Sequence, residues 1–414
     1  MNRRTFLSGC SAAIAAMAGS QLHSMTFSTA DNNPEIFILV FLRGGMDGLH
    51  LVAPVSDKNY IDSREIGLRI TESGTQKGLP LINTLSGQDF YLHAKALPFK
   101  ELYDSKQLAI IHACGLTNGT RSHFDAMDLI DKGVSDTNSA PSTGWLTRLL
   151  ETIPHTGHLP AISATPQLPV SLLGSNTATS LYDPKGFTLN ADPRFTGILK
   201  NLYQGDSALA RTAQQTLQTI QYIQSKLPRK NGTLTDYVPD NLAHYPSQWQ
   251  VQELTQSFKT LAQLIKMDVG LQVATIDFGG WDMHEGQTWL FPLLLEGFSQ
   301  ALTAFYNDIH LYHKRVTIAV MSEFGRRLRS NKSNGTDHGY GNAMLVLGGN
   351  VKGGTMYGKW PGLATEQLDN RVDLAVTTDY RTILSEICMK RLHTSAIQTI
   401  FPGFIKPQLL TFLS

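Results

Sequence analysis

The stretch Glu35-Ile-Phe-Ile-Leu-Val-Phe-Leu42, followed directly by Arg43-Gly-Gly-Met-Asp-Gly48, decides the fold. A nearly unbroken apolar run is typical of a strand buried on both faces of a parallel sheet. The glycines after it predict a tight turn or a close approach of the backbone to a ligand. Residues just past the carboxyl ends of strands line the ligand crevice of open α/β sheets, so this stretch predicts a central strand that places Asp47 in a site.

The same pattern recurs along the chain. The runs Leu271–Ile276 and Val316–Met321 are each followed by acidic residues. Further strands are expected at Leu108–Ala113, Pro160–Ala164, Val170–Leu173 and Ala343–Leu347. Apolar residues at helical spacing predict helices from Leu254 to Ile265 and from Leu294 to Ile309. This alternation predicts an α/β fold with a mostly parallel central sheet and helices on both faces.

Two segments without a clear period interrupt this alternation. Gly174 to Pro193 and Leu227 to Ser247 are rich in Asn, Asp, Pro and Gly, which is typical of surface insertions. Neither is long or biased enough to be a linker between domains, and no repeat of fixed period is present. We therefore expect residues 31–414 to form a single domain.

The N-terminus has the features of an export signal. Asn2-Arg3-Arg4-Thr5-Phe6-Leu7 matches a twin-arginine motif, and a short alanine-rich apolar segment follows it. The alternative is an amphipathic N-terminal helix, but the run has no polar face. We expect residues 1–30 to be a signal peptide that engages the twin-arginine translocase and delivers a folded protein to the periplasm or the medium, with no membrane contact after cleavage.

Composition excludes several classes of partner. Charged residues make up 17% of the 414 residues and the formal net charge is +1, so no broad field favours nucleic acid or an anionic membrane surface. After the signal only Cys114 and Cys388 remain, both in apolar surroundings. Two buried thiols are expected there rather than a disulfide.

The loops that follow the predicted strands carry the residue types of a metal site. Asp282 and His284, at a spacing of two, point to the same side of an extended segment, which suits Zn²⁺, Mn²⁺ or Fe. The expected cofactor is a divalent metal such as Zn²⁺, Mn²⁺ or Mg²⁺. Further carboxylates and a histidine stand after other strands. The expected metal ligands are Asp47, Asp282, His284, Glu323 and His338.

Four of these five positions also have a structural alternative. Asp47 precedes a glycine and is equally suited to capping the next segment. Asp282 and His284 suit a hydrogen-bonded pair. Asp337 and His338 suit a salt-bridged surface turn.

A second polar stretch, Arg121-Ser122-His123-Phe124-Asp125, precedes an amphipathic helix. A hydroxyl at a helix start is a favourable nucleophile because the free amides and the helix dipole favour an anion there. Ser122 with Asp125 is also a capping pair. His123 suits an acid, a base, a ligand or a core hydrogen bond. Arg43, Arg121 and Arg326 are the expected anion-binding groups.

In order, these motifs resemble the DUF1501 family of exported bacterial proteins. The shared stretches are Arg43-Gly-Gly-Met-Asp-Gly48, Arg121-Ser-His-Phe-Asp125, Asp277-Phe-Gly-Gly-Trp-Asp-Met-His284, Ser322-Glu-Phe-Gly-Arg326 and Asp337-His-Gly339. That family is similar in fold to the alkaline phosphatase and sulfatase superfamily, in which metal sites flank a hydroxyl or modified cysteine nucleophile.

The resemblance implies a role for each motif. Asp47 stands where the superfamily has its first-strand aspartate, and Ser122 where it has the nucleophile. Asp282, His284, Glu323 and His338 stand at metal-ligand positions. Phe324 replaces a histidine of the superfamily pattern, which favours one metal or none over two.

The sequence thus predicts an exported metal-dependent hydrolase of phosphate or sulfate esters. Its expected partners are a small anionic ester or glycan substrate and the translocase. The alternative is a degenerate member of the superfamily that binds a glycan, a partner or the cell envelope without turnover.

Overall fold

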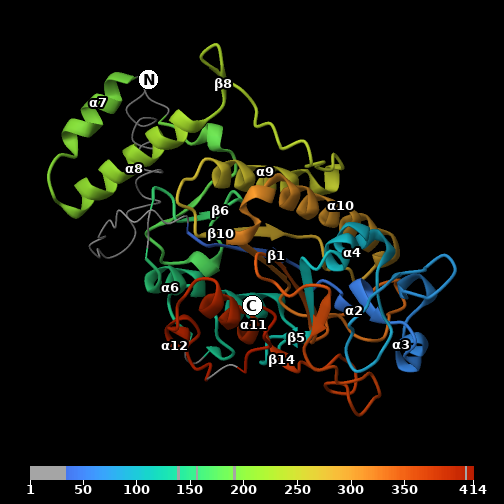
Figure 1. Cartoon of the computed structure of the whole chain (residues 1–414). Coiled ribbons are helices and arrows are strands. Elements are labelled where there is room, and N and C mark those ends of the chain that lie inside the picture. Colours follow the sequence, from blue (N-terminus) through green and yellow to red (C-terminus); the bar gives the residue numbers. More distant parts are fainter. Residues whose placement is uncertain (1–33, 138–139, 155–156, 190–192, 406–407) are drawn as a thin grey trace.

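The computed structural model describes residues 34–137, 140–154, 157–189, 193–405 and 408–414. The predicted signal peptide, residues 1–30, lies outside them. The described residues contain a nine-stranded central sheet with the order β13-β5-β12-β11-β1-β10-β6-β7, and β14 pairs with β5 (Figure 1). The strands are β1 (Ile36–Leu42), β5 (Leu108–Gly115), β6 (Ala161–Ser163), β7 (Ala178–Ser180), β10 (Val273–Phe278), β11 (Val316–Met321), β12 (Asn342–Gly348), β13 (Thr355–Tyr357) and β14 (Thr378–Asp379).

The sheet is mostly parallel, as predicted. Strand β1 lies in its centre and pairs in parallel with both β10 and β11. Strand β12 is antiparallel to its neighbours β11 and β5, and the remaining pairs in this nine-stranded sheet are parallel. The carboxyl ends of β1, β10 and β11 therefore lie at one edge of the sheet, with Leu42 opposite Phe278 and Phe41 opposite Met321.

Helices cover both faces, which explains the unbroken apolar run of β1. Ile36, Ile38, Val40 and Leu42 enter one hydrophobic core, while Phe37, Leu39 and Phe41 enter the other. The first core is covered by α4 (Leu97–Asp104), α9 (Gln252–Lys266) and α10 (Gln287–Asp308), and the second by α5 (His123–Lys132), α6 (Trp145–Thr152), α11 (Tyr380–Lys390) and α12 (Ile397–Ile400) (Figure 1). All seven residues of β1 are buried, because each face of the strand meets a helical layer.

One predicted strand is wrong. Val170–Leu173 contains the 3-10 helix η4 (Val170–Leu172), and the edge strand of the sheet is β7 inside the predicted insertion. Pro169 before the segment and Gly174 after it leave only four residues, of which Val170 and Leu173 are exposed. The run is therefore too poorly buried to form an inner strand of the sheet, and the flanking proline and glycine favour a turn.

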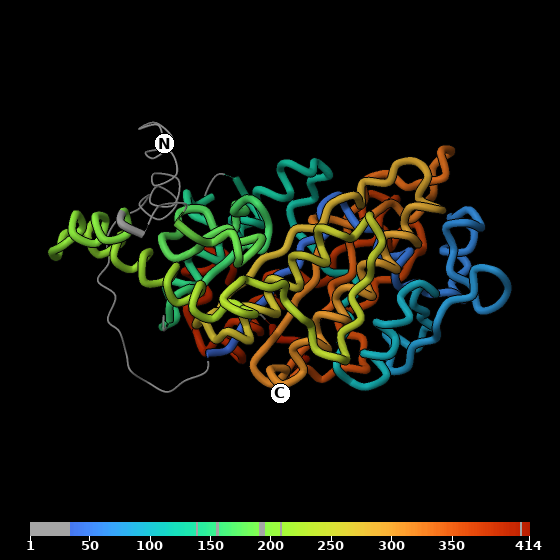
Figure 2. The backbone as a smooth tube through the Cα atoms, turned by 90° about the horizontal axis from the view of Figure 1, so that it is seen from above, coloured from blue at the N-terminus to red at the C-terminus, as the bar shows by residue number. Residues whose placement is uncertain are grey.

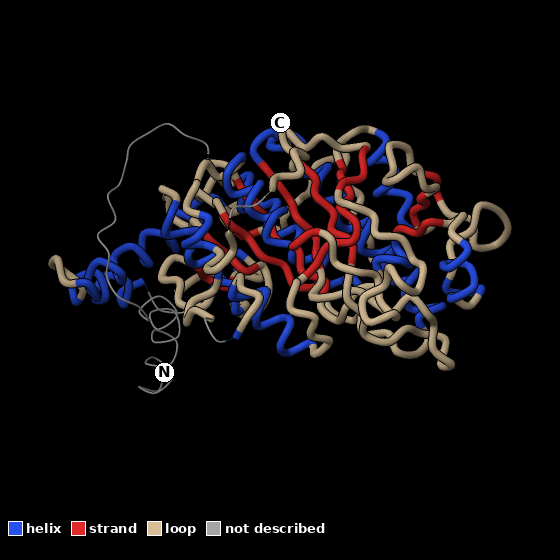
Figure 3. Tube along the Cα trace, turned by 90° about the horizontal axis from the view of Figure 1, so that it is seen from below, coloured by secondary structure: helices blue, strands red, loops and turns tan. Residues whose placement is uncertain are grey.

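Smaller elements surround the central sheet (Figure 3). A three-stranded sheet is formed by β2 (Val52–Pro54), β3 (Leu79–Pro80) and β4 (Phe90–Leu92), and a hairpin by β8 (Arg229–Lys230) and β9 (Thr233–Leu234). The short helices α2 (Gly48–Leu51) and α3 (Lys58–Ser63) follow β1, and the pair α7 (Pro193–Leu202) and α8 (Ala208–Lys226) projects from one end of the molecule (Figure 2). None of the described helices combines the length and apolar character needed to cross a membrane. Cys114 and Cys388 are both buried free thiols, as expected.

Candidate metal centre

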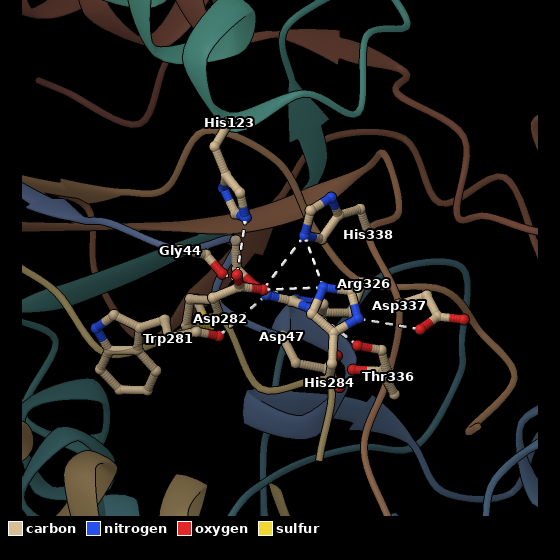
Figure 4. Close-up of polar contacts among 12 residues, drawn as sticks. Gly44, Asp47, His123, Trp281, Asp282, His284, Arg326, Thr336, Asp337 and His338 are labelled. Atoms are coloured by element: carbon tan, nitrogen blue, oxygen red, sulfur yellow. Dashed lines mark hydrogen bonds and ion pairs between the residues drawn. The ribbon is translucent and has the colours of Figure 1, made fainter. Parts of the chain in front are cut away.

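Loops from three parallel strands and the start of α5 meet at the carboxyl edge of the sheet. One ligand atom each from His123, Asp282 and His338 lies within 4.8 Å of the other two (Figure 4). His284 adjoins this group, with its Nε2 2.9 Å from Nε2 of His338 and 3.1 Å from Oδ1 of Asp282. We call His123, Asp282, His284 and His338 the metal centre.

The protonation of His338 is set by a backbone carbonyl. Its Nδ1 lies 2.8 Å from the carbonyl oxygen of Arg121, which can only accept a hydrogen bond. Burial lowers the pKa of His338, so the ring is neutral, with its proton on Nδ1 and a lone pair on Nε2. That Nε2 faces Oδ1 of Asp282 at 3.2 Å. Two lone-pair atoms in contact repel each other unless a proton or a cation binds to both.

The other two histidines are held in the same way. Nδ1 of His284 lies 3.1 Å from Oδ1 of Asp337, and Nδ1 of His123 lies 2.7 Å from Oε1 of Glu323. A carboxylate on Nδ1 leaves Nε2 free to ligate, and such outer partners are typical of metal-binding histidines. The hydrogen bond with Glu323 also raises the pKa of His123, against the effect of burial.

Nε2 of His123 is a buried atom without a hydrogen-bond partner among the described residues. It lies 3.4 Å from Oδ2 of Asp282, within ion-pair distance but outside hydrogen-bonding geometry. A buried polar nitrogen is rarely left unsatisfied. A metal ion at the centre would satisfy it.

Asp282 supplies the negative charge of the centre. Burial raises the pKa of Asp282, but the hydrogen bond and charge of Arg326 outweigh that effect and bring it down to about 2. The side chain is 47% exposed and ionised at neutral pH. Imidazole nitrogens with a carboxylate oxygen form a donor set that suits Zn²⁺ or Mn²⁺, so the residues fit a divalent metal.

The structure corrects the role expected for Arg326. This buried guanidinium donates to the carboxylate of Asp282 at 2.7 Å. It also donates to the carbonyl oxygens of Gly44, Gly45, Trp281 and Thr336. These contacts tie three loops together around a guanidinium that is only 1% exposed, so Arg326 is not available to bind an anionic substrate.

The other two predicted anion-binding arginines are also neutralised. Arg43 donates to Asp131 at 3.2 Å and to Asp277 at 3.1 Å. Arg121 donates to Asp369 at 2.8 Å and to Asp373. Each guanidinium therefore already has two carboxylate partners.

Asp131, the buried partner of Arg43, should make the free energy of unfolding depend on pH. Burial raises the pKa of Asp131 to about 6, although Arg43 opposes the rise. Because this pKa is higher in the folded state, the contribution of Asp131 to stability is present below about pH 4 and is lost as the pH rises through about 6. In Asp131→Asn this pH-dependent contribution should disappear. Urea unfolding at pH 4, 5 and 7 measures it, and identical pH slopes for both proteins would contradict the assignment.

Asp47, a predicted ligand, lies in a buried ion pair instead. Its two oxygens accept hydrogen bonds from Arg64 at 2.6 and 2.9 Å. It also accepts one from Gln287 at 2.7 Å and caps α2 through the amide of His50 at 3.1 Å. The capping alternative thus describes Asp47 better, because the carboxylate has no free oxygen for a metal.

Gln287 connects this ion pair to the metal centre and was missed in the sequence. Its Nε2 donates to Asp47, and its Oε1 accepts from the hydroxyl of Thr336 at 2.6 Å. Thr336 precedes Asp337 and His338 in the chain. Asp47 therefore supports the centre through Gln287 rather than as a ligand. No sequence pattern marks a glutamine for such a role.

Glu323 and Ser122 also differ from their predicted roles. Glu323 is fully buried and accepts from the amide of Gly44 at 2.8 Å, from the hydroxyl of Ser322 at 2.9 Å and from His123. It orients a candidate ligand and is not one of the residues grouped at the centre. The hydroxyl of Ser122 caps α5 by accepting from the amide of Asp125 at 3.4 Å, as the alternative for this residue proposed.

The glycine turn after β1 is required by close packing. Gly44 has a φ of +119°, and a Cβ there would lie 2.5 Å from the backbone nitrogen of Asp282. Only glycine accepts both the conformation and the contact. The turn thereby presents its amide to Glu323 and its carbonyl to Arg326.

Comparisons with known proteins place the chain in a family. The C-terminal periplasmic domain of EcEptC from Escherichia coli, in complex with Zn, is 6% identical, with 79% of this chain and 77% of that chain covered and a TM-score of 0.35. A protein in the alkaline phosphatase superfamily from Vibrio parahaemolyticus is 9% identical (84% and 70% covered, TM-score 0.33). Alkaline phosphatase from the Antarctic bacterium TAB5 is 10% identical (78% and 93% covered, TM-score 0.31). No curated protein sequence matches. The profile of a family described as a protein of unknown function, DUF1501, matches residues 35–390, and the chain belongs to this family.

Proposed function

We propose that this protein is a metal-dependent hydrolase of phosphate or sulfate esters. The main support for a metal is the contact of Nε2 of His338 with Oδ1 of Asp282 at 3.2 Å. The proton of this imidazole is on Nδ1, where the carbonyl oxygen of Arg121 accepts it. Two further imidazoles converge on the same carboxylate. One ligand atom each from His123, Asp282 and His338 lies within 4.8 Å of the other two, and Arg326 donates only to Oδ1 of Asp282, which leaves Oδ2 for a cation.

Each residue of the centre has a distinct task in this proposal. His123, Asp282 and His338 would hold the cation, with His284 as a fourth donor. A bound divalent metal polarises an ester oxygen and lowers the pKa of a bound water. Arg326 keeps Asp282 ionised, and the outer carboxylates hold their imidazoles in the ligating tautomer. We assign the attack to water rather than to Ser122, whose hydroxyl caps α5.

The charges of the centre support a metal as the anion-binding group. Asp282, Glu323 and Asp337 bring three negative charges, and Arg326 brings one positive charge. A divalent cation would therefore neutralise the centre. Arg43, Arg121 and Arg326 are already paired with carboxylates. The negative oxygen of the ester would therefore have to contact the metal itself.

A hydrolysis screen tests this function. Purified protein, stripped with chelator and reloaded with Zn²⁺, Mn²⁺ or Mg²⁺, would be assayed on aryl phosphates, aryl sulfates and phosphodiesters. We expect turnover that requires a metal, is lost in His338→Ala and persists in Ser122→Ala. Metal binding without turnover on any ester would instead favour the alternative of a non-catalytic binding protein of the cell envelope.

We also propose export through the twin-arginine translocase, based on Asn2-Arg3-Arg4-Thr5-Phe6-Leu7. The protein would then act in the periplasm or outside the cell. Cell fractionation of a variant with lysines in place of Arg3 and Arg4 tests this, because the protein should remain in the cytoplasm.

A further inference from the structure

We propose that Phe124 and Trp289 form an aromatic rim that binds a sugar ring of the ligand beside the metal centre. This inference rests on the proposed function in one respect: the ester group of the ligand is taken to react at the metal centre. The rim would select ligands by their carbohydrate portion, whichever bond is cleaved.

The two rings stand at the starts of the helices that begin at the centre. His123 is the first residue of α5 and Phe124 the second, while α10 begins at Gln287, three residues after His284. Phe124 is 83% exposed and Trp289 is 65% exposed. Phe124 therefore directly follows a residue of the centre, and Trp289 lies two residues beyond Gln287, which supports the centre through Thr336.

Trp289 is folded back towards the loop that carries His284. A Cβ placed on Gly286 would lie 2.6 Å from Nε1 of Trp289, so the indole lies directly beside this glycine. The same loop is fixed by the amide of Gly286, which donates to the carbonyl of Ser333 at 3.3 Å. The indole is thus presented by an ordered part of the site.

Exposed rings beside a polar centre are typical of a binding surface. Single exposed apolar side chains are common on protein surfaces, but two large rings on the segments that carry His123 and His284 match the aromatic lining of ligand sites. Other aromatic residues near the centre follow the ordinary pattern, since Trp281 and Phe324 are buried. Phe124 lies in a motif that otherwise supplies one candidate ligand and one helix cap, and neither role needs a phenyl ring.

The polar groups of the rim favour a neutral polyhydroxylated ring. Asp125, next to Phe124, is exposed, and the side chains of Asp282 and Asp337 are about half exposed. Carboxylates accept hydrogen bonds from hydroxyl groups. A pyranose offers hydroxyl donors on its edge and an apolar C–H face for an aromatic ring. The paired arginines argue against recognition of a second anionic group.

Affinity electrophoresis tests the rim. The full-length mature protein would be run in native gels that contain soluble xylan, laminarin, dextran, hydroxyethyl cellulose or galactomannan. We expect retardation by at least one polysaccharide, and in Phe124→Ala and Trp289→Ala a dissociation constant raised about tenfold, the scale of one aromatic contact.

Trp249→Ala provides a matched control. Trp249 is 78% exposed, and its neighbour Gln248 contacts Gln300 at 3.1 Å. Gln300 lies thirteen residues beyond Gln287 on α10, about 20 Å along the helix axis. Retardation should be unchanged in this variant.

The outcomes separate the rim from the metal centre. Polysaccharide binding that persists in the His338→Ala variant but is weakened in Phe124→Ala supports the rim even if no ester is hydrolysed. Absence of retardation by all five polysaccharides, or equal weakening by Trp249→Ala, overturns it. A change of oligomeric state in Phe124→Ala, measured by light scattering, would also overturn it, because the ring would then contact a second copy.

Discussion

Asp282→Asn is expected to lower the affinity for a divalent metal more than about 100-fold, because loss of an outer partner alone typically costs 10–100-fold and Asp282 would contact the ion directly. The amide keeps the volume of the side chain but removes the only carboxylate of the metal centre. The fold should persist, since Arg326 keeps four carbonyl acceptors. Metal content after dialysis against graded chelator, with a thermal unfolding curve for each sample, measures both effects.

Two further variants provide reference values for the loss of metal affinity in Asp282→Asn. Glu323→Gln leaves the centre complete but weakens the partner of His123, so its loss of affinity should lie within about 10–100-fold. Asp236→Asn removes an exposed carboxylate whose partner is Lys185 and should change nothing. If Asp282→Asn bound metal as tightly as Asp236→Asn, the metal centre would be assigned to the wrong residues.

Asp47→Asn is expected to destabilise the protein by about 3–5 kcal/mol, because it leaves the buried guanidinium of Arg64 without its counter-charge. Burial raises the pKa of Asp47, but Arg64 outweighs this effect and lowers it overall. The stabilisation is therefore present at neutral pH and is lost as the pH falls below the ordinary aspartate range. Urea unfolding at pH 7 measures the change.

The same variant separates a structural from a ligating aspartate. At saturating metal, the folded fraction of Asp47→Asn should bind as much metal as the native protein. In a double-mutant cycle with Arg64→Gln, the combined loss of stability should be smaller than the sum of the single losses, because both changes break one interaction. Additive losses, or a folded protein without metal, would show that Asp47 acts elsewhere.

Much of the fold follows from local sequence patterns. Strand β11 has the predicted bounds, and β1, β5 and β10 differ from theirs by one or two residues at the ends. Burial between two helical layers requires a continuous apolar run, and such a run is visible without knowing the partners. The antiparallel direction of β12 was not predictable in this way. An antiparallel strand that is buried between two neighbours has the same continuous apolar run as a parallel strand.

The chemistry of the site was only partly accessible. The loops that meet at the centre were identified, since polar residues after parallel strands gather at one edge of a sheet. Their roles were not. Asp47 and Glu323 looked like ligands, and His123 like a catalytic group, whereas the structure places both carboxylates in support and the histidine in the centre.

The sequence by itself determined the α/β class, the central strand and the loops that carry the candidate chemistry, because these depend on periodicity and on residues that are neighbours in the chain. Only the tertiary structure decided which charges are neutralised. Arg64 meets Asp47 across 17 positions and Arg326 meets Asp282 across 44. Arg64 bonds both oxygens of Asp47, whereas Arg326 bonds only Oδ1 of Asp282. A carboxylate can bind a metal only where one of its oxygens is left unpaired, and that depends on contacts between distant segments.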